Sequence, residues 1–195
     1  MNALARLAYR PGSLDRIAWF LAGLRFPARA IRLPRLEDLC YHMQVKALSL
    51  RNTATAREFA PLLERAAALP ASAWEFLNTA PDGRSVLVDN AHLKVMLIRW
   101  EPGTASARHF HPNGGGMIRV LEGAIQESRF LNDTIAVPYD VRTLERHAMS
   151  YIDDRLGAHV VANPGAQPAV TLHAYLKDRR TQKERSTLLA ERGAG

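Results

Sequence analysis

The chain has 195 residues, of which 47% are hydrophobic, and this length and composition are typical of one folded domain with extensions. The net charge is +7, but residues 1–35 carry +6 and residues 177–195 carry +3, which leaves −2 for residues 36–176. That negative balance argues against a nucleic-acid-binding domain, and the absence of any apolar run of about 18 residues argues against a transmembrane segment.

The first 35 residues form a predicted basic N-terminal extension. They contain seven arginines and a single acidic residue, Asp15. Residues 14–24 are expected to form a short amphipathic helix, and Pro27 interrupts the pattern after it. The charges inside this helix argue against a signal peptide. A second basic extension, the C-terminal tail, is expected at residues 177–195.

Residues 36–77 have the apolar spacing of helices. One helix is expected around residues 36–43, a second at residues 55–69, and a short helical turn at residues 72–77. Cys40 is the only cysteine of the chain, so no intrachain disulfide can form, and the cysteine usage fits a reducing cytoplasm. We expect Cys40 to be a buried structural thiol rather than a nucleophile.

From Arg84 onward the pattern changes to short strands separated by Gly, Pro, Asn and Asp. The expected strands are Ser85–Val88, Leu93–Trp100, Ala105–His111, Met117–Leu121, Ala124–Phe130, Ala148–Asp153, Ala158–Ala162 and Val170–Leu176. Many short strands with regular turn signals indicate a small jelly-roll barrel, whose mouth can hold a ligand. The sequence therefore predicts a mainly β fold, with one domain at residues 36–176 and its N-terminal helices packed outside the barrel.

Two histidines, His109 and His111, stand one residue apart in the expected strand. Alternate residues of a strand point to the same face about 7 Å apart, so both imidazoles should enter one space. His159 follows 48 residues after His111, and a neighbouring strand can bring it beside the other two. Three imidazoles that share one space are candidate metal ligands. Three further histidines are expected to be structural: His42, His92 and His147.

The charge of such a site limits its chemistry. Three neutral imidazoles leave a divalent ion with its full positive charge and with open coordination positions on its other face. The site should therefore favour an anionic ligand such as a thiolate and leave room for dioxygen. We expect iron(II), one ion per chain, because oxygen activation requires open positions and a redox couple. The ligands alone leave zinc, nickel and manganese open.

The histidines lie within a longer pattern. Residues 103–123 resemble the first cupin motif, G-x5-H-x-H-x3,4-E-x6-G, with Gly116 at the position of the motif's glutamate. His159 and Asn163 resemble the core of the second cupin motif. Over about residues 36–176 the chain is similar to the cysteine dioxygenase type I family, in its bacterial form. That resemblance implies a cupin barrel that holds a mononuclear iron by three histidines, without the glutamate ligand.

The resemblance also implies roles for four further residues. In the family a Ser-x-His-x-Tyr segment follows the third histidine, and Thr171, His173 and Tyr175 stand at those positions. The family pattern implies that Tyr175 donates a hydrogen bond to the substrate or to oxygen, that His173 orients Tyr175, and that Thr171 orients His173. The family's aromatic-x-Arg segment places Arg84 as the residue that holds the substrate carboxylate, with Asp82 at the aromatic position.

The implied activity is that of a bacterial, cytoplasmic enzyme of cysteine catabolism. It would act as a monomer on a small thiol and O2, adding both oxygen atoms to sulfur and converting L-cysteine to cysteine sulfinic acid. Gly116 excludes the cysteine–tyrosine cross-link of animal members. One alternative is a related dioxygenase acting on 3-mercaptopropionate, which typically has glutamine at the arginine position. An alternative of another class is a non-oxidative metal-binding cupin or a small-molecule binding module.

Overall fold

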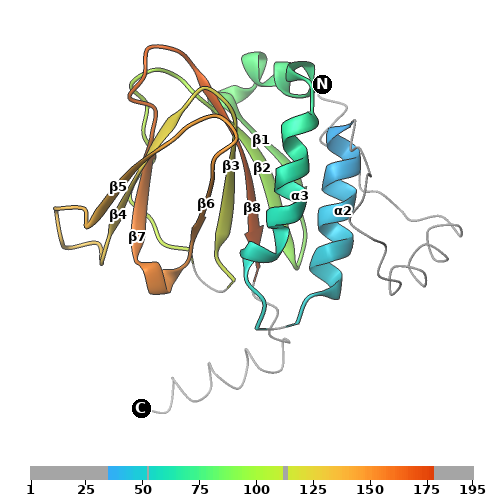
Figure 1. Cartoon of the computed structure of the whole chain (residues 1–195), viewed down its shortest axis with the longest axis horizontal. Coiled ribbons are helices and arrows are strands. Elements are labelled where there is room, and N and C mark those ends of the chain that lie inside the picture. Colours follow the sequence, from blue (N-terminus) through green and yellow to red (C-terminus); the bar gives the residue numbers. More distant parts are fainter. Residues whose placement is uncertain (1–34, 52, 112–113, 178–195) are drawn as a thin grey trace, which may run out of the picture.

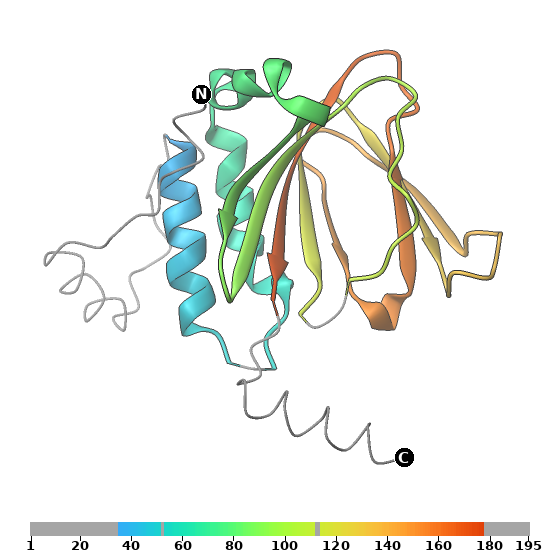
Figure 2. The ribbon, with the colours of Figure 1, turned by 180° about the vertical axis from the view of Figure 1, so that it is seen from behind.

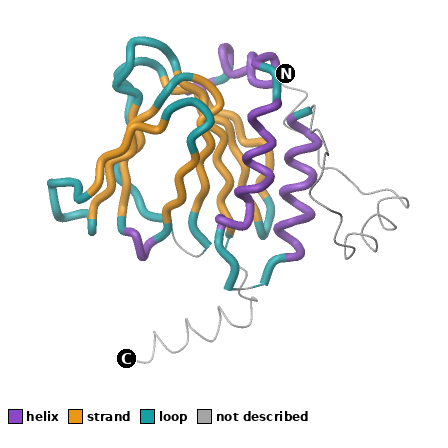
Figure 3. Tube along the Cα trace, in the orientation of Figure 1, coloured by secondary structure: helices purple, strands orange, loops and turns teal. Residues whose placement is uncertain are grey.

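The computed structural model describes residues 35–51, 53–111 and 114–177. Figure 1 shows three layers: a helical layer, a five-stranded sheet and a three-stranded sheet, in that order. The same layers are seen from behind in Figure 2 and by secondary structure in Figure 3. Among the described residues, no helix has the length and apolar character needed to cross a membrane. The expected helix at residues 14–24 and nearly all of both basic extensions lie outside the described residues.

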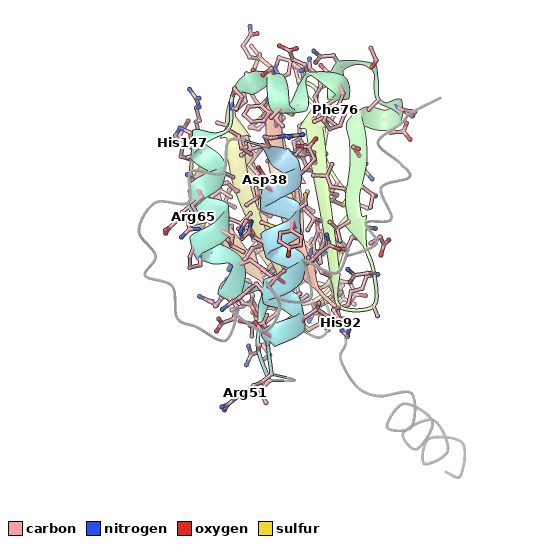
Figure 4. All side chains as sticks on the ribbon, turned by 90° about the vertical axis from the view of Figure 1, so that its right-hand side faces the viewer. Asp38, Arg51, Arg65, Phe76, His92 and His147 are labelled. Atoms are coloured by element: carbon pink, nitrogen blue, oxygen red, sulfur yellow. The ribbon has the colours of Figure 1, made fainter. Side chains whose placement is uncertain are left out.

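The helical layer covers the outer face of the larger sheet (Figure 4). Its elements are α2 (Leu36–Ser49), η2 (Ala56–Phe59), α3 (Ala60–Arg65), η3 (Ala66–Ala68), η4 (Ala71–Thr79) and η5 (Pro81–Gly83), where η denotes a 3-10 helix. The single helix expected at residues 55–69 is divided into three pieces. Pro61 lies in the first turn of α3, where its missing N–H costs no helical hydrogen bond.

Two antiparallel sheets face each other beside this layer. The larger has the strand order β1-β2-β8-β3-β6, and the smaller has β5-β4-β7. The strands are β1 (Arg84–Asp89), β2 (Leu93–Trp100), β3 (Gly116–Glu122), β4 (Ile125–Phe130), β5 (Asp140–Leu144), β6 (Met149–Ile152), β7 (Ala158–Ala162) and β8 (Ala169–Leu176), with η6 (Asp154–Leu156) before β7. The prediction of a mainly β, jelly-roll-like cupin barrel with N-terminal helices outside it is confirmed.

Strand alternation divides the core into two clusters. The outer residues of β8 pack against the helices: Val170, Leu172, Ala174 and Leu176. Ile98, Ile118 and Val161 belong to the second cluster, which lies between the sheets. Fully burying a side chain of this size contributes about 1.5–3 kcal/mol, so both faces of the larger sheet stabilise the fold. The inner face of β8 carries polar groups instead, and these form part of the site described below.

Two strand predictions need correction. Residues 105–111 do not form a regular strand. They pair with β7 at two isolated bridges, Ala105 with Ala162 and His109 with His159, and the backbone N–H of Ser106 donates to the carbonyl of Val161. Between the two bridges the hydroxyl of Ser106 accepts the backbone N–H of Val161 at 3.1 Å, so a side chain replaces a backbone partner and regular pairing stops. Strand β5 was not expected, because its side chains are largely exposed and give no apolar alternation.

Candidate metal centre

Two segments bring three histidines together inside the barrel. The β2–β3 connection carries His109 and His111, and β7 carries His159. His109 and His159 are fixed by reciprocal backbone hydrogen bonds, with N···O distances of 3.1 and 2.9 Å. The ligand nitrogens of the three residues lie within 4.8 Å of one another. The structure therefore groups the three predicted ligands, although His109 and His111 lie in an irregular segment rather than in a strand.

The spacing of the three imidazoles fits a metal ion. The Nε2 atom of His159 lies 2.9 Å from Nε2 of His111 and 3.3 Å from Nε2 of His109. Nitrogens bound at about 2.1 Å with angles between 90° and 109° lie about 3.0–3.4 Å apart. Both separations from His159 fall close to this range, and all three ligand nitrogens lie within 4.8 Å of one another, so the three residues could hold a single ion.

The hydrogen bonds of the other ring nitrogens direct lone pairs into this space. The Nδ1–H of His109 donates to the carbonyl of Ala107 at 2.8 Å, and the Nδ1–H of His159 donates to Oε1 of Glu127 at 2.8 Å. In their neutral forms both residues then carry bare Nε2 lone pairs that face each other, and a positive centre between them relieves the repulsion. Burial lowers the pKa of His109, and it lowers the pKa of His111 to about 3.

A buried carboxylate supports His159 from behind. Glu127 is completely buried on β4, and its Oε2 accepts hydrogen bonds from Ser150 at 2.6 Å and from Arg129 at 3.0 Å. Burial alone would raise the pKa of Glu127, but the bonds from His159 and Ser150, together with the charge of Arg129, lower it to about 2. A carboxylate that accepts from a ligand histidine fixes its tautomer and orientation.

Sequence reasoning missed this carboxylate. Ile125, Glu127 and Arg129 occupy alternate buried positions of β4, so two of these three positions are charged. Charged residues at alternate buried positions indicate a paired internal network rather than a solvated face. The register of β4 against β7 places Arg129 opposite His159, so this network lies directly beside the candidate metal centre.

The inner face of β8 carries a second hydrogen-bonded chain. Nε2 of His173 lies 2.7 Å from Oγ1 of Thr171, and Nδ1 of His173 lies 2.8 Å from the hydroxyl of Tyr175. The indole N–H of Trp100 donates to Thr171 at 2.8 Å, an interaction that sequence reasoning did not include. Burial lowers the pKa of His173 to about 3, which keeps the ring neutral, and burial raises the pKa of Tyr175.

The distances indicate which groups donate and which accept along this series of hydrogen bonds. The Thr171 hydroxyl can donate to His173 at 2.7 Å or to the carbonyl of Ile98 at 3.5 Å, and only the first distance is that of a good O–H donor bond. If Thr171 donates to Nε2, the neutral His173 carries its proton on Nδ1 and donates to the oxygen of Tyr175. The hydroxyl proton of Tyr175 is then available to a ligand in the barrel.

Gly116 lets Tyr175 approach the histidines. The Tyr175 ring stacks on His111 with ring centroids 5.1 Å apart and an angle of 12° between the planes. A Cβ atom at Gly116 would lie 2.7 Å from Cδ1 of Tyr175, closer than side-chain atoms pack. Absence of a side chain at residue 116 therefore sets the position of the tyrosine, in addition to removing a carboxylate.

A cavity of about 540 Å³ joins these groups. It is lined by Arg84, Lys94, Met96, Ile98, Trp100, Ser106, Ala107, His109, His111, Gly115, His159, Val161, His173, Tyr175, Leu176 and Lys177. Arg84 begins β1 opposite Ile98, and its charge contributes to lowering the pKa values of His109 and His173. Asp82 is not a lining residue; it lies in the exposed turn before β1 with a φ of 53°, a conformation that aspartate tolerates.

Four other sequence candidates lie outside the cavity. His42 donates from Nδ1 to the carbonyl of Asp38 at 2.6 Å. Figure 4 places His92 and His147 at opposite ends of the helix-covered side. Cys40 is buried in α2, and burial raises the pKa of its thiol to about 12, so the thiolate is disfavoured. These residues contribute no ligand to the three-histidine group.

Comparison with known proteins gives a match over most of the chain. Residues 41–184 match the family described as cysteine dioxygenase type I. The human and zebrafish (Danio rerio) proteins named "cysteine dioxygenase type 1" are each 32% identical to the chain, over 96 and 98 residues. Each alignment covers 46% of this chain and 48% of the relative. The chain thus spans about half the length of the curated relatives it matches.

Solved structures resemble the barrel at lower identity. A crystal structure from Bacillus halodurans is 18% identical, with a TM-score of 0.47 over 57% of this chain and 83% of the other. A cupin-2 domain-containing protein from Shewanella frigidimarina is 15% identical, with a TM-score of 0.38 over 48% of this chain and 79% of the other. The family assignment therefore rests on the sequence match.

Proposed function

This chain belongs to the cysteine dioxygenase type I family, and we propose that it is an iron-dependent thiol dioxygenase whose substrate is L-cysteine. The reaction adds both atoms of O2 to the thiol sulfur and gives a sulfinic acid. One observation carries the proposal: the ligand nitrogens of three imidazoles lie within 4.8 Å of one another, in the same cavity as Tyr175 and Arg84. Each of these groups has a part in binding or oxidising a small thiol acid.

The three imidazoles His109, His111 and His159 would hold the iron(II) ion, one per chain. When bound, iron(II) supplies the electron-transfer chemistry that lets dioxygen react with a thiol. The fit of the nitrogens to a single ion, and the lone pairs that face one another, support this assignment. Glu127 would keep His159 oriented through its hydrogen bond to Nδ1–H.

Arg84 would bind the substrate carboxylate. Its guanidinium can form two parallel hydrogen bonds to a carboxylate, and its charge reaches the site strongly enough to affect the pKa of Tyr175 and of the buried histidines. A carboxylate held there directs the thiol of a short amino acid toward the imidazoles, which raises the rate through proximity. 3-Mercaptopropionate fits the same arrangement and is therefore the competing substrate in the assay below.

Tyr175 would donate its hydroxyl proton as a hydrogen bond to the reacting thiol acid. His173 holds the tyrosine oxygen from behind, and Thr171 sets the His173 tautomer that leaves this proton free. Because burial raises the pKa of Tyr175, the group stays protonated at physiological pH. Trp100 completes the support by donating to Thr171.

Turnover with defined substrates tests the proposal. Iron(II)-loaded protein should consume oxygen with L-cysteine and convert it to a product heavier by two oxygen atoms. His159→Ala should lose both iron binding and turnover, whereas Tyr175→Phe should keep iron and turn over more slowly. Arg84→Gln should raise the KM for cysteine. Absence of oxygen uptake with cysteine and with 3-mercaptopropionate, in protein that contains iron, would contradict the dioxygenase assignment and favour a non-oxidative cupin.

We also propose that residues 36–176 form one domain and that the protein acts as a monomer in the cytoplasm. A chain with one cysteine can form no intrachain disulfide, and this cysteine usage supports a reducing compartment. Sedimentation of the full chain at several concentrations tests the monomer, because a dimer would double the measured mass.

A further inference from the structure

A second cleft lies beside the three-histidine centre and shares no lining residue with its cavity. It has a volume of about 490 Å³ and lies among the edge strand β6, the strands β4 and β5, and η2. Three arginines line it, Arg57, Arg129 and Arg142, and no acidic residue does. Three guanidinium groups on one cleft are an unusual concentration of positive charge, and they come from three separate elements.

The three arginines converge through identifiable contacts. Arg142 on β5 stands directly opposite Glu127 on β4, so it faces the same side of the sheet as Arg129. The guanidinium of Arg57 lies over the ring of Tyr151, 4.1 Å from its centroid, and the backbone carbonyl of Tyr151 accepts from Nη2 of Arg129 at 2.7 Å. Packing and strand register thus hold all three groups around one space.

Arg129 offers an unused donor to this space. Only 4% of the residue is exposed, and its Nε and Nη2 atoms supply the hydrogen bonds to Glu127, Ser150 and Tyr151. Within residues 35–51, 53–111 and 114–177, no hydrogen bond involves Nη1, yet Nη1 is not among the polar atoms that are both buried and without a partner. Nη1 therefore keeps some solvent exposure, and the cleft is the cavity that Arg129 lines.

The charges of the cleft favour an anion. Arg142 is paired with Asp140, and Arg129 is paired with Glu127 behind the cleft wall. Among the described residues Arg57 forms no ion pair, which leaves one positive charge unmatched. Planar guanidinium groups bind carboxylate, phosphate and sulfate oxygens through paired hydrogen bonds, and an oxyanion between them also relieves their mutual repulsion.

We propose that this three-arginine cleft is a binding site for small oxyanions and that it is linked to His159 through Arg129 and Glu127. An anion that accepts from Nη1 of Arg129 competes with Glu127 for the guanidinium charge. Glu127 in turn accepts the Nδ1–H of His159, so the anion changes how strongly the carboxylate holds the candidate metal ligand. Because coupling between two sites is reciprocal, a bound metal must change the affinity for the anion by the same factor.

Phosphate binding to the full-length, metal-free protein tests the site without thiol or oxygen. Isothermal calorimetry with inorganic phosphate should give saturable binding. Arg142→Gln should weaken it about tenfold or more, the size expected for one charge-assisted hydrogen bond. Arg99→Gln is the matched control, because Arg99 also pairs with an acid two residues away but lies outside the cleft. No saturable binding, or equal weakening by both variants, would overturn the oxyanion site.

Metal loading tests the link separately. Zinc is a redox-inert probe for the three histidines, and phosphate affinity should differ between the zinc-loaded and metal-free proteins. This difference should shrink in Arg142→Gln, whereas phosphate bound to the zinc itself would give the same difference in that variant. Zinc affinity measured with and without phosphate should change by the same factor. Equal phosphate affinities in the two forms would overturn the link to His159. Neither measurement depends on turnover, so failure of the dioxygenase proposal and failure of this one are distinguishable.

Discussion

Replacing Glu127 by glutamine should damage both the fold and the metal site. The carboxylate accepts four hydrogen bonds: His159 Nδ1 on Oε1, and Ser150 Oγ, Arg129 Nε and Arg129 Nη2 on Oε2. A glutamine has one acceptor oxygen and one donor NH2 group. Whichever way the amide turns, its NH2 faces a donor, and Arg129 loses its counter-charge while remaining 4% exposed.

The magnitude follows from burial. Breaking a buried ion pair by removing one partner costs about 3–5 kcal/mol, because the remaining charge stays desolvated. Glu101→Gln is the matched control, since Glu101 also pairs with an arginine two residues away, but its side chain is 57% exposed whereas that of Glu127 is 0% exposed. The exposed pair should contribute less than about 1 kcal/mol.

Two assays separate the effects. Urea unfolding of metal-free protein should give a free energy of unfolding about 3–5 kcal/mol lower for Glu127→Gln and nearly unchanged for Glu101→Gln. Zinc titration of the folded proteins should show affinity about 10–100-fold lower for Glu127→Gln, the usual effect of losing the acceptor behind a ligand histidine. If Glu127→Gln matched the wild type in both assays, the role given to the buried carboxylate would be wrong.

Three other predictions concern the β8 chain. Thr171→Val should leave the N–H of Trp100 and Nε2 of His173 without partners, at about 1–3 kcal/mol each, and should lower kcat more than it raises KM. Thr171→Ser should restore both stability and kcat. An unchanged kcat in the valine variant would refute the role of Thr171 in setting the His173 tautomer. Burial raises the pKa of Tyr175 above its usual value near 10, so above pH 10 the unfolded chain loses the hydroxyl proton before the folded protein does. The contribution of Tyr175 to the free energy of unfolding is therefore complete below pH 10 and declines above pH 10. The wild type should then lose up to about 1.4 kcal/mol per pH unit more than Tyr175→Phe in urea unfolding, and parallel pH curves would contradict this. Gly116→Ala should displace the Tyr175 ring, because the added Cβ would lie 2.7 Å from Cδ1 of that ring. Contacts between Tyr175 and His111 in nuclear magnetic resonance spectra should then weaken. Unchanged contacts would show that residue 116 does not set the position of the ring.

Local patterns in the sequence were sufficient for most of the barrel. Turn residues separated short β-branched runs, and Val170, Leu172, Ala174 and Leu176 alternate with polar residues along β8, so its two faces could be assigned before any coordinates. Strand β5 was missed because an exposed edge strand needs no apolar alternation. The prediction of a continuous strand at residues 105–111 was wrong. The hydrogen bond to the Ser106 side chain interrupts the pairing, and no change in the apolar pattern of the sequence marks it.

The residues of the site also fall into those that the sequence identified and those that it did not. Spacing identified His109, His111 and His159 as candidates, because ligand histidines recur at motif distances. Glu127 and Trp100 were missed, since each acts through a partner distant in the chain, 32 residues from His159 and 71 residues from Thr171. Only strand register reveals such pairs. The three-arginine cleft likewise joins η2, β4 and β5, and no local pattern connects those elements.

Isotope labelling tests the central claim most directly. Full-length protein loaded with iron(II) is given L-cysteine under ¹⁸O2, and the mass of the product is measured. The account predicts a sulfinic acid in which both oxygen atoms on sulfur come from the same gas, so that the product is about four mass units heavier than under ordinary oxygen. Product with one or no labelled oxygen, or oxygen uptake that yields only cystine, would contradict a dioxygenase at the three-histidine centre.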